Sequence, residues 1–300
     1  MLHTAIIILI AALAVLYVVL CPRVNYALYR PLMFHPVGFG NAEEASAPEL
    51  SGVTGQNITF KNDRGEKLWA WYYNQPGAKY TVLLSHGNGG NMGYRTDTVS
   101  LLLDAGLSVL IYDYRGYGNS EGLPHITGIC QDGLAAYSYL NQTCGIADDH
   151  IILYGESLGC SVTTNISTQK KCAGMILQSG FVSLYRIATE FFPVLRIYPG
   201  KLLSDPTMDN LSIVKLPHPP LLIMHGHLDQ TVPFSHAKAI FSAACEPKRF
   251  LDLPQCGHCD ICSEAQPEFS KAIAEFVQWI DKDPNRSTVQ PGVSSKGSDT

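Results

Sequence analysis

The sequence Gly155-Glu156-Ser157-Leu158-Gly159 lies between an apolar run at 150–154 and a stretch of small and β-branched residues at 160–168. A strand, a G-x-S-x-G turn and a helix together are the sequence form of a nucleophile elbow. Glycines suit so tight a turn, because larger side chains would collide across it. The turn would expose the Ser157 hydroxyl and aim the first amides of the next helix beside it. Alone, the pattern also fits an ordinary surface turn, so its meaning depends on the rest of the chain.

Short apolar runs alternate with segments of helical periodicity on both sides of this pentapeptide. The predicted strands are residues 58–60, 67–73, 80–85, 107–112, 150–154, 173–178, 220–225 and 249–253. The predicted helices are residues 91–105, 126–140, 157–170, 235–244 and 267–281. This alternation indicates an α/β fold with a mostly parallel central sheet and helices on both faces. In such sheets the functional site lies at the carboxyl ends of the strands.

Three chemically capable side chains follow three of the predicted strands. Ser157 follows the strand at 150–154, Asp229 follows 220–225 and His258 follows 249–253. A serine hydroxyl is a poor nucleophile at neutral pH, so a base must take its proton during attack. We predict that His258 is this base, and that Asp229 orients its ring and stabilises the imidazolium. The oxyanion would accept hydrogen bonds from the backbone amides of Leu158 and Asn88.

Several further motifs accompany this order of serine, aspartate and histidine. They are Ser85-His86-Gly87-Asn88-Gly89-Gly90-Asn91, the stretch Tyr112-Asp113-Tyr114-Arg115-Gly116-Tyr117-Gly118 with its continuation to Gly122, the H-G-x-x-D segment at 225–229, and Gly257-His258-Cys259-Asp260. With these motifs the chain resembles the α/β-hydrolase superfamily and, within it, the Bem46-like group, over about residues 55–282. The resemblance implies an α/β-hydrolase fold with a short cap and a Ser157-His258-Asp229 triad. It implies neither a cofactor nor a metal.

Other acidic residues compete with Asp229 for the third position. Asp113 also follows a strand, but in the resembling family its stretch shapes the site and does not join the triad. Asp205 is a second rival. Asp260 stands so close to His258 in sequence that its side chain does not readily reach the far ring nitrogen. We therefore favour Asp229.

Other polar residues near strand ends have structural interpretations. We interpret His86 as part of a loop that works through its backbone, and His225 as a packing histidine. No partner for His227 is evident from the sequence. Arg115 is expected to form a structural ion pair.

The nine cysteines form no disulfide framework typical of small secreted domains. Cys256, Cys259 and Cys262 stand close together, and Cys259 replaces the asparagine usual in the resembling group. A structural zinc site normally takes two ligand pairs, and there is no second C-x-x-C. The three thiols are reactive, paired in an oxidising compartment, or packing residues. We favour packing.

The chain begins with an uncharged apolar segment at residues 4–20, which is just long enough for a bilayer span. A cleaved signal peptide and a buried core helix are the alternatives. The aromatic segment at 24–35 lies either at the membrane interface or against the domain. The predicted organisation is an N-terminal membrane anchor at 1–23, a juxtamembrane segment and linker at 24–56, an α/β-hydrolase domain at 57–282 with a cap at about 181–215, and a disordered tail at 283–300.

The orientation of this anchor stays open. Arg23 and Arg30 follow the span and no Lys or Arg precedes it, a pattern that favours a cytosolic domain. Five N-x-S/T sequons favour a lumenal one, and they begin at Asn57, Asn141, Asn165, Asn210 and Asn285. The net charge of −5 and the lack of a basic run outside the membrane flank argue against nucleic-acid binding.

The sequence thus predicts a membrane-anchored serine hydrolase that cleaves carboxylic esters or thioesters of lipid-like acyl groups. A short apolar cap suggests a shallow site, open to a large substrate or to the membrane plane. The expected substrate is a small molecule, a lipid or an acylated protein, in the endomembrane system or at the plasma membrane. The alternatives are a palmitoyl-protein thioesterase specifically, or a non-catalytic interaction protein with the same fold. The oligomeric state is not predicted.

Overall fold

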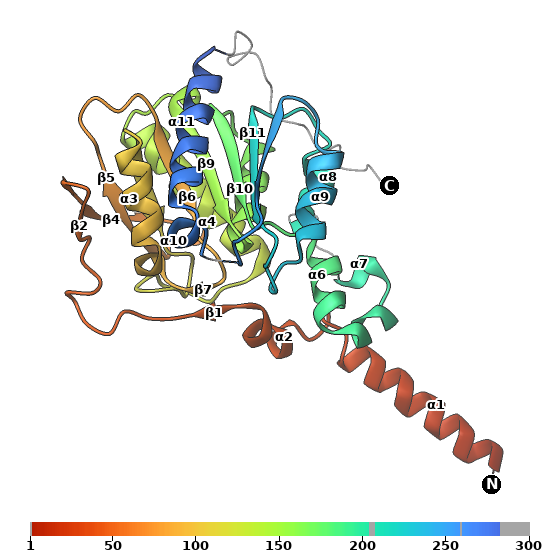
Figure 1. Ribbon diagram of the computed structural model, residues 1–300. Helices are drawn as coiled ribbons and strands as arrows, with labels where there is room; N and C mark the ends of the chain where they lie inside the picture. The colour runs from red at the N-terminus through yellow and green to blue at the C-terminus, as the bar shows by residue number, and fades with distance from the viewer. Residues whose placement is uncertain (1, 204–207, 259, 283–300) are drawn as a thin grey trace.

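The computed structural model describes residues 2–203, 208–258 and 260–282 (Figure 1). The predicted tail at 283–300, the rival acid Asp205, the sequon at Asn285 and Cys259 lie outside the described residues.

The centre of the molecule is an eight-stranded sheet in the order β12-β11-β10-β9-β6-β8-β5-β4. β4 and β5 form the predicted antiparallel hairpin, β5 is antiparallel to β8, and the remaining neighbours are parallel. The mostly parallel sheet is therefore confirmed. The strands are β4 Gln56–Lys61, β5 Lys67–Tyr73, β6 Thr81–Ser85, β8 Ser108–Tyr112, β9 Ile151–Glu156, β10 Gly174–Gln178, β11 Leu221–Gly226 and β12 Lys248–Leu253.

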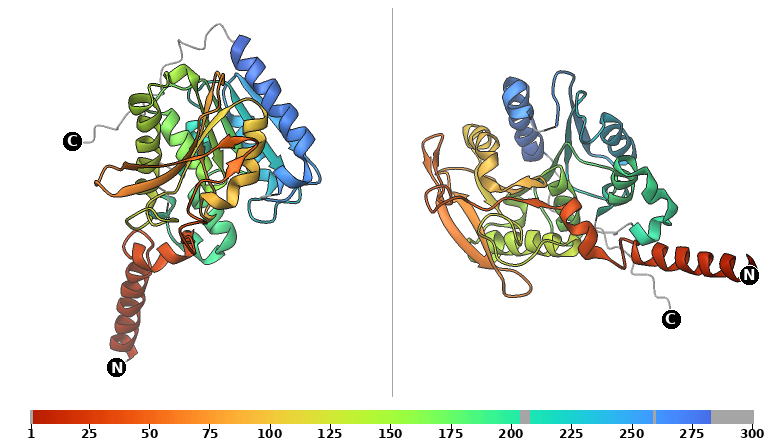
Figure 2. Two further views of the ribbon diagram at one scale, coloured as in Figure 1. Left: turned by 90° about the vertical axis from the view of Figure 1, so that its left-hand side faces the viewer. Right: turned by 90° about the horizontal axis from the view of Figure 1, so that it is seen from below.

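Helices cover both faces of this sheet, as Figures 1 and 2 show. α3 (Thr96–Asp104), α10 (Ile261–Glu264) and α11 (Gln266–Lys282) pack on one face. The other face carries α4 (Ile126–Ser138), α5 (Leu158–Ser167), α8 (Asn210–Ile213) and α9 (Phe234–Ala243). Every residue of the five strands β6, β8, β9, β10 and β11 is buried. That burial explains why these strands read as continuous apolar runs rather than alternating ones.

Some helix boundaries differ from the predicted ones. The helix expected at 91–105 begins with a 3₁₀ turn at Met92–Arg95, where the Asn91 side chain accepts a hydrogen bond from the Gly93 amide. The helix expected at 126–140 passes into a π-helical turn at Tyr139–Thr143. The elbow helix α5 ends at Ser167, three residues earlier than predicted.

The cap lies between β10 and β11. Its helices are α6 (Leu184–Phe191), a 3₁₀ helix at Pro193–Ile197, and α7 (Gly200–Leu203). The first helix of the chain, α1 (Leu2–Val19), projects away from the domain next to this cap (Figure 1). None of its side chains is buried, and it is the one helix among the described residues long and apolar enough to span a membrane.

The segment between α1 and β4 contacts the domain along much of its length. It contains α2 (Tyr26–Met33), which leads into the buried Phe34. β1 (His35–Pro36) pairs with β7 (Gly89–Gly90), and the Trp71 ring nitrogen donates to the carbonyl of Ala45 at 3.1 Å. The stretch at 36–56, expected as a linker, is thus packed on the domain through the buried Ala45 and a few half-buried apolar residues, namely Phe39, Ala47, Leu50 and Val53.

The structure bears on four of the five sequons. Asn210 is fully buried, and its side chain bonds both Phe181 and Thr164. Asn165 is also buried, and the Asn141 amide nitrogen donates to Ile146 and Asp148. Only Asn57 is an exposed asparagine among the described sites. Because a glycan needs an accessible nitrogen, the sequon count overstates the case for a lumenal domain.

Candidate active site

The predicted elbow forms between β9 and α5. Ser157 has φ 53° and ψ −111°, a strained conformation for a residue with a side chain. The flanking glycines allow it, because a Cβ on Gly155 would lie 2.5 Å from the carbonyl oxygen of Gly159. A Cβ on Gly159 would lie 1.9 Å from the carbonyl oxygen of Ser85 on the neighbouring strand. Close approach of backbone to backbone therefore requires both glycines.

The structure brings Ser157, His258 and Asp229 together from three separate strand ends. The His258 Nε2 atom lies 3.0 Å from the Ser157 Oγ, and its Nδ1 lies 2.7 Å from the Asp229 Oδ2. Ser157 directly follows β9, while the other two lie on the loops after β11 and β12. These distances are those of a nucleophile, a base and a residue that orients the base. The Ser179 hydroxyl donates to the carbonyl of His258 at 3.0 Å and fixes this loop.

Asp229 is buried and held from several directions. Its Oδ1 accepts hydrogen bonds from the amides of Thr231 and Val232 at 2.8 and 2.7 Å. Burial would raise the pKa of this carboxyl, but hydrogen bonds from His225 and His258 outweigh it and hold the pKa well below its usual range. The carboxylate therefore stays ionised at neutral pH and can stabilise a positive charge on His258.

His225 has a role that the sequence interpretation missed. Its Nε2 lies 2.8 Å from the carbonyl oxygen of Val232 and 3.2 Å from the Asp229 Oδ2, inside the buried core. The His225 ring thus packs in the core and also contacts the Asp229 carboxylate. The only signal in the sequence is the spacing of four residues to Asp229.

The loop after β6 lies beside the elbow, as its proposed oxyanion role requires. A Cβ on Gly87 would lie 3.5 Å from the Ser157 Cβ. The Asn88 side chain is held by the Tyr117 hydroxyl, which donates to its Oδ1 at 2.9 Å, and by His35 at 3.0 Å. Leu158 is the first residue of α5, so its amide belongs to the N-terminal turn of that helix.

A buried ion pair joins this loop to the elbow. Arg95 donates to the Glu156 carboxylate at 2.7 Å and to the carbonyl of Gly89 at 2.9 Å. Glu156 directly precedes Ser157, so the pair fixes the loop and the nucleophile relative to each other. The sequence interpretation assigned no role to either residue.

The competing acids face other partners. Asp113 lies 3.3 Å from the His86 ring and accepts a hydrogen bond from the Met92 amide at 2.7 Å. Asp260 accepts from the amide of Gly257 at 2.7 Å, so it supports the histidine loop from within. The Nε2 atom of His227, for which no partner was predicted, lies 2.5 Å from the Asp252 Oδ1.

The two described cysteines of the C-terminal cluster are packing residues. Cys256 is buried in the core, and Cys262 is half-buried 3.2 Å from the Thr98 hydroxyl. Burial raises the pKa of each thiol to about 11. Both are therefore protonated and weakly nucleophilic at neutral pH. Within the described residues, no three His, Cys or acidic side chains gather as metal ligands would.

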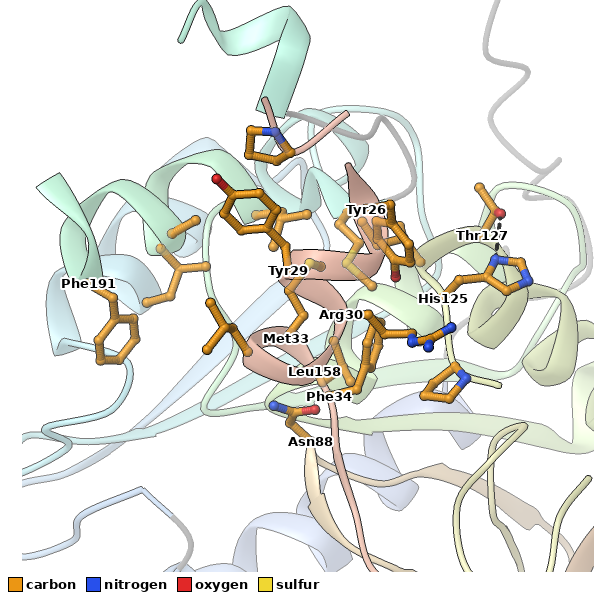
Figure 3. Close-up of a pocket in the computed structure, with 18 of the residues that line it drawn as sticks. Tyr26, Tyr29, Arg30, Met33, Phe34, Asn88, His125, Thr127, Leu158 and Phe191 are labelled. Atoms are coloured by element: carbon orange, nitrogen blue, oxygen red, sulfur yellow. Dashed lines mark hydrogen bonds between the residues drawn. The ribbon is translucent and has the colours of Figure 1, made fainter. Parts of the chain in front are cut away.

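A cavity of about 1130 Å³ opens above Ser157 and Leu158 (Figure 3). Two apolar segments enclose it, namely α2 from the N-terminal region and α6 from the cap. Its volume exceeds the roughly 300–1,000 Å³ common for small-molecule sites. The cap is as short as predicted, but α2 supplies a second wall. The apolar lining includes Tyr26, Tyr29, Met33, Leu184, Ile187 and Phe191.

The opposite end of the cavity is polar. Arg30, Arg64, His125 and Thr127 line it, and Figure 3 shows Arg30 on the side of α2 that faces His125. The cavity lining thus combines many apolar side chains with a smaller set of polar ones, and Ser157 is part of that lining. This division suits a substrate with an apolar chain and a polar head.

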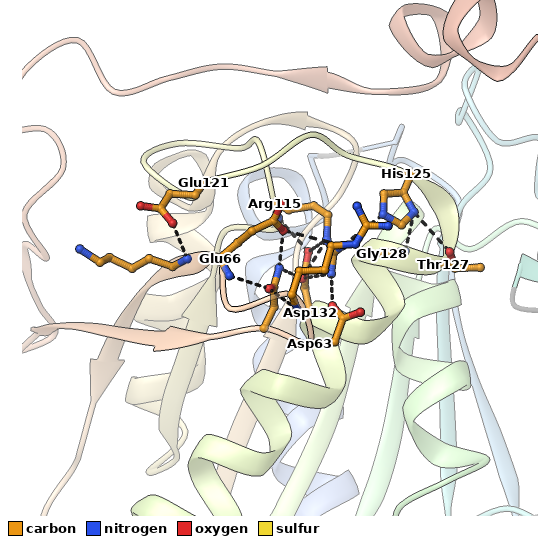
Figure 4. Close-up of polar contacts among 11 residues, drawn as sticks. Asp63, Glu66, Arg115, Glu121, His125, Thr127, Gly128 and Asp132 are labelled. Carbon is orange, nitrogen blue, oxygen red and sulfur yellow. Dashed lines mark hydrogen bonds and ion pairs between the residues drawn. The ribbon is translucent and has the colours of Figure 1, made fainter.

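A buried network stands behind the polar wall (Figure 4). Arg115 is fully buried and donates to Asp132 at 2.8 Å, to Asp63 at 2.6 Å and to His125 at 3.1 Å. Burial would lower the pKa of Arg115, but the hydrogen bonds with Asp132 and Asp63 outweigh it, and the pKa is raised. Arg115 therefore carries its charge inside the domain, and the predicted structural ion pair is confirmed.

Replacing Arg115 with methionine is expected to lower the free energy of unfolding by about 3–5 kcal/mol, because it leaves the buried Asp132 charge without its partner. Urea unfolding of the full chain in detergent measures this change. The control is Lys79→Met, which removes an exposed ion pair with Asp281 and should cost about 1 kcal/mol or less. Equal costs for the two variants would contradict the structural role of Arg115.

Comparisons with known proteins agree with this architecture. The family model described as "Serine aminopeptidase, S33" matches residues 76–213. Alpha/beta hydrolase domain-containing protein 17C of Xenopus tropicalis is 32% identical over 235 residues, which cover 77% of this chain and 72% of that protein. A protein of Mycobacterium tuberculosis, Rv2307c, is 33% identical over 219 residues, covering 71% and 76%.

Solved structures share the fold at low sequence identity. The esterase Pf2001 of Pyrococcus furiosus superposes with a TM-score of 0.67 at 17% identity, covering 82% of this chain and 98% of that one. An alpha-beta serine hydrolase homologue from Coxiella burnetii gives a TM-score of 0.57 at 20% identity, covering 73% and 96%.

Proposed function

The chain belongs to the α/β-hydrolase superfamily, and from this premise we propose that it is a membrane-anchored hydrolase of lipid-like acyl esters or thioesters. The family and the fold support a serine hydrolase of the esterase type. The observation that carries the finer proposal is the hydrogen-bonded series Ser157, His258 and Asp229 in the floor of a largely apolar cavity. The apolar helix α1 supports the membrane anchor.

The proposed mechanism follows from the geometry. His258 Nε2 takes the proton of the Ser157 hydroxyl while the oxygen attacks the acyl carbonyl carbon. The oxyanion formed accepts hydrogen bonds from the amides of Leu158 and Asn88. His258 then returns the proton to the leaving alcohol or thiol as the acyl-enzyme forms. Water, deprotonated by His258, releases the acid and restores Ser157.

Asp229 performs a supporting role throughout this cycle. Its carboxylate accepts a hydrogen bond from the Nδ1–H of His258, which leaves Nε2 free to receive the serine proton. All three side chains lie at hydrogen-bonding distance, which disfavours the alternative of a non-catalytic interaction protein. Esters and thioesters share the mechanism, so a palmitoyl-protein thioesterase remains the narrower form of the proposal.

A fluorophosphonate probe is expected to label the full chain in detergent, and mass spectrometry should place the label on the peptide that contains Ser157. Heat-unfolded protein is the control, because an unfolded serine lacks its base. Labelling of a different residue, or none on folded protein, would contradict the proposed nucleophile.

A substrate series then tests the acyl group. Matched oxygen and thiol esters from acetyl to palmitoyl should be hydrolysed with a kcat/KM that rises with chain length, because longer chains bury more apolar surface in the cavity. Preference for the acetyl ester would contradict the lipid-like substrate while leaving the serine hydrolase intact. The ratio of thioester to ester rates decides between the two bond types.

A further inference from the structure

Five large apolar side chains are both exposed and part of the cavity wall. One is Leu123, on the loop before α4, and the other four are Leu32 of α2 and Phe191, Phe192 and Val194 of the cap, which we call the rim. Their exposed fractions are 56%, 53%, 49% and 67%, respectively. Contiguous exposed apolar residues of this kind mark a surface that another apolar body covers. Since the same residues line the cavity, whatever covers the rim also stands at the entrance to the site.

The surface around the rim has the composition of a membrane-contacting face. Leu28 and Ile197, which lie outside the cavity wall, are also exposed and extend the apolar area. Arg23, Arg196 and Lys201 add positive charge beside it. Apolar side chains flanked by Lys and Arg are typical of segments that lie in the bilayer interface, where lipid phosphates meet the cations.

Direct contacts hold this surface at the end of α1. The Tyr198 hydroxyl donates to the carbonyl of Tyr17 at 3.0 Å, and the two rings lie 4.6 Å apart. Arg23 donates to the carbonyl of Lys201 at 3.0 Å. The cap is therefore bonded to the last turn of α1 and to the residues that follow it. Figures 1 and 2 show α1 leaving the domain at this point.

The length of α1 determines how deep the rim would lie in a bilayer that α1 spans. Its 18 residues would span about 27 Å at 1.5 Å per residue, close to the roughly 30 Å hydrocarbon core of a bilayer. If α1 crosses the membrane, Tyr17 lies near the edge of the hydrocarbon, and the cap bonded to it lies at the level of the head groups. The bilayer that holds α1 is thus the apolar body that reaches the rim.

We infer that the rim is inserted in the surface of that bilayer, and that the acyl chain of the substrate enters the cavity sideways from the lipid between α2 and α6. This inference rests on the proposed function and narrows its substrate class to acyl compounds resident in the same membrane. Soluble esters would have to reach Ser157 by another route. A second copy of this chain is the alternative cover for the rim.

Insertion is measured without reference to catalysis. Val194→Trp is reconstituted as the full chain in phosphatidylcholine vesicles, with or without bromine on the acyl chains. Brominated lipid should quench the added tryptophan fluorescence by at least about half, because interfacial segments lie roughly 5–10 Å into the boundary of head groups and acyl chains. The matched control is Asp104→Trp, an exposed position at the end of α3, near the amino end of β8 and thus away from the carboxyl ends of the strands, which should show no added quenching. Equal quenching at the two positions overturns the inference, and crosslinked dimers in the same vesicles would identify a second copy as the cover.

The route of entry is measured with a surface variant. Leu28→Ser/Ile197→Ser changes exposed side chains outside the cavity wall. We expect about tenfold slower hydrolysis of a long-chain ester embedded in vesicles, and an unchanged rate with a short soluble ester in detergent. Equal effects on both substrates overturn the lateral entry. Quenching of Val194→Trp without any hydrolysis would instead contradict the proposed function and leave the insertion standing.

Discussion

Replacing Ser157 with alanine is expected to lower kcat by about 10⁶-fold, as loss of a nucleophilic serine does in related mechanisms. The Ser157 oxygen forms the bond to the acyl carbon, and an alanine leaves His258 without a proton to accept. The turnover of a long-chain ester by the purified full chain measures this loss. The residual rate reports what the oxyanion amides and substrate binding supply alone.

Ser161 provides the matched control for this variant. It lies one turn further along α5 with its hydroxyl buried and, among the described residues, without a hydrogen-bond partner. Ser161→Ala should therefore keep kcat within about twofold of the natural chain, since it removes no interaction with substrate. If Ser157→Ala retained more than about 1% of the natural kcat while staying folded, another group would have to be the nucleophile.

Asp229→Asn is expected to lower kcat by about 10⁴-fold with little change in the position of the ring. An asparagine presents an N–H to the Nδ1 of His258, so the ring must place its own proton on Nε2. That tautomer cannot accept the proton of Ser157. The measurement is kcat with the same long-chain ester, together with the melting temperature, because Asp229 also accepts the Thr231 and Val232 amides.

Asp113→Asn tests whether Asp113, a competing acid in the sequence, could hold the triad position that we assign to Asp229. Asp113 contacts His86 and the Met92 amide, so this variant should keep kcat within about tenfold of the natural chain. A larger loss in Asp113→Asn than in Asp229→Asn would reverse the assignment. Both variants replace a buried carboxylate by an amide, which makes their losses directly comparable.

The parts of the molecule that were predictable have local signals. The buried strands are continuous apolar runs. The elbow is marked by Gly155 and Gly159, where a Cβ would collide with the backbone. Given a parallel sheet, the rule that sites lie at the carboxyl ends of its strands predicts that Ser157, Asp229 and His258 lie close together.

The parts that were missed depend on contacts between distant segments. Arg95 and Glu156 are 61 residues apart, and nothing in either surrounding sequence marks them as a pair. His225 reaches Asp229 only because the loop after β11 folds back on itself. The sequence of α2 fits two interpretations, since eight residues with a proline inside carry too weak a pattern to show what they cover.

α2 both follows the proposed membrane anchor and forms one side of the cavity above Ser157. A chain beginning after Phe34 would keep Ser157, His258 and Asp229 but would lack the α2 side of the cavity. If α1 anchors the protein as proposed, exchange of the first 34 residues is expected to alter both which acyl chains fit and where the protein resides. A relative with a different N-terminal segment is then expected to differ in both localisation and specificity.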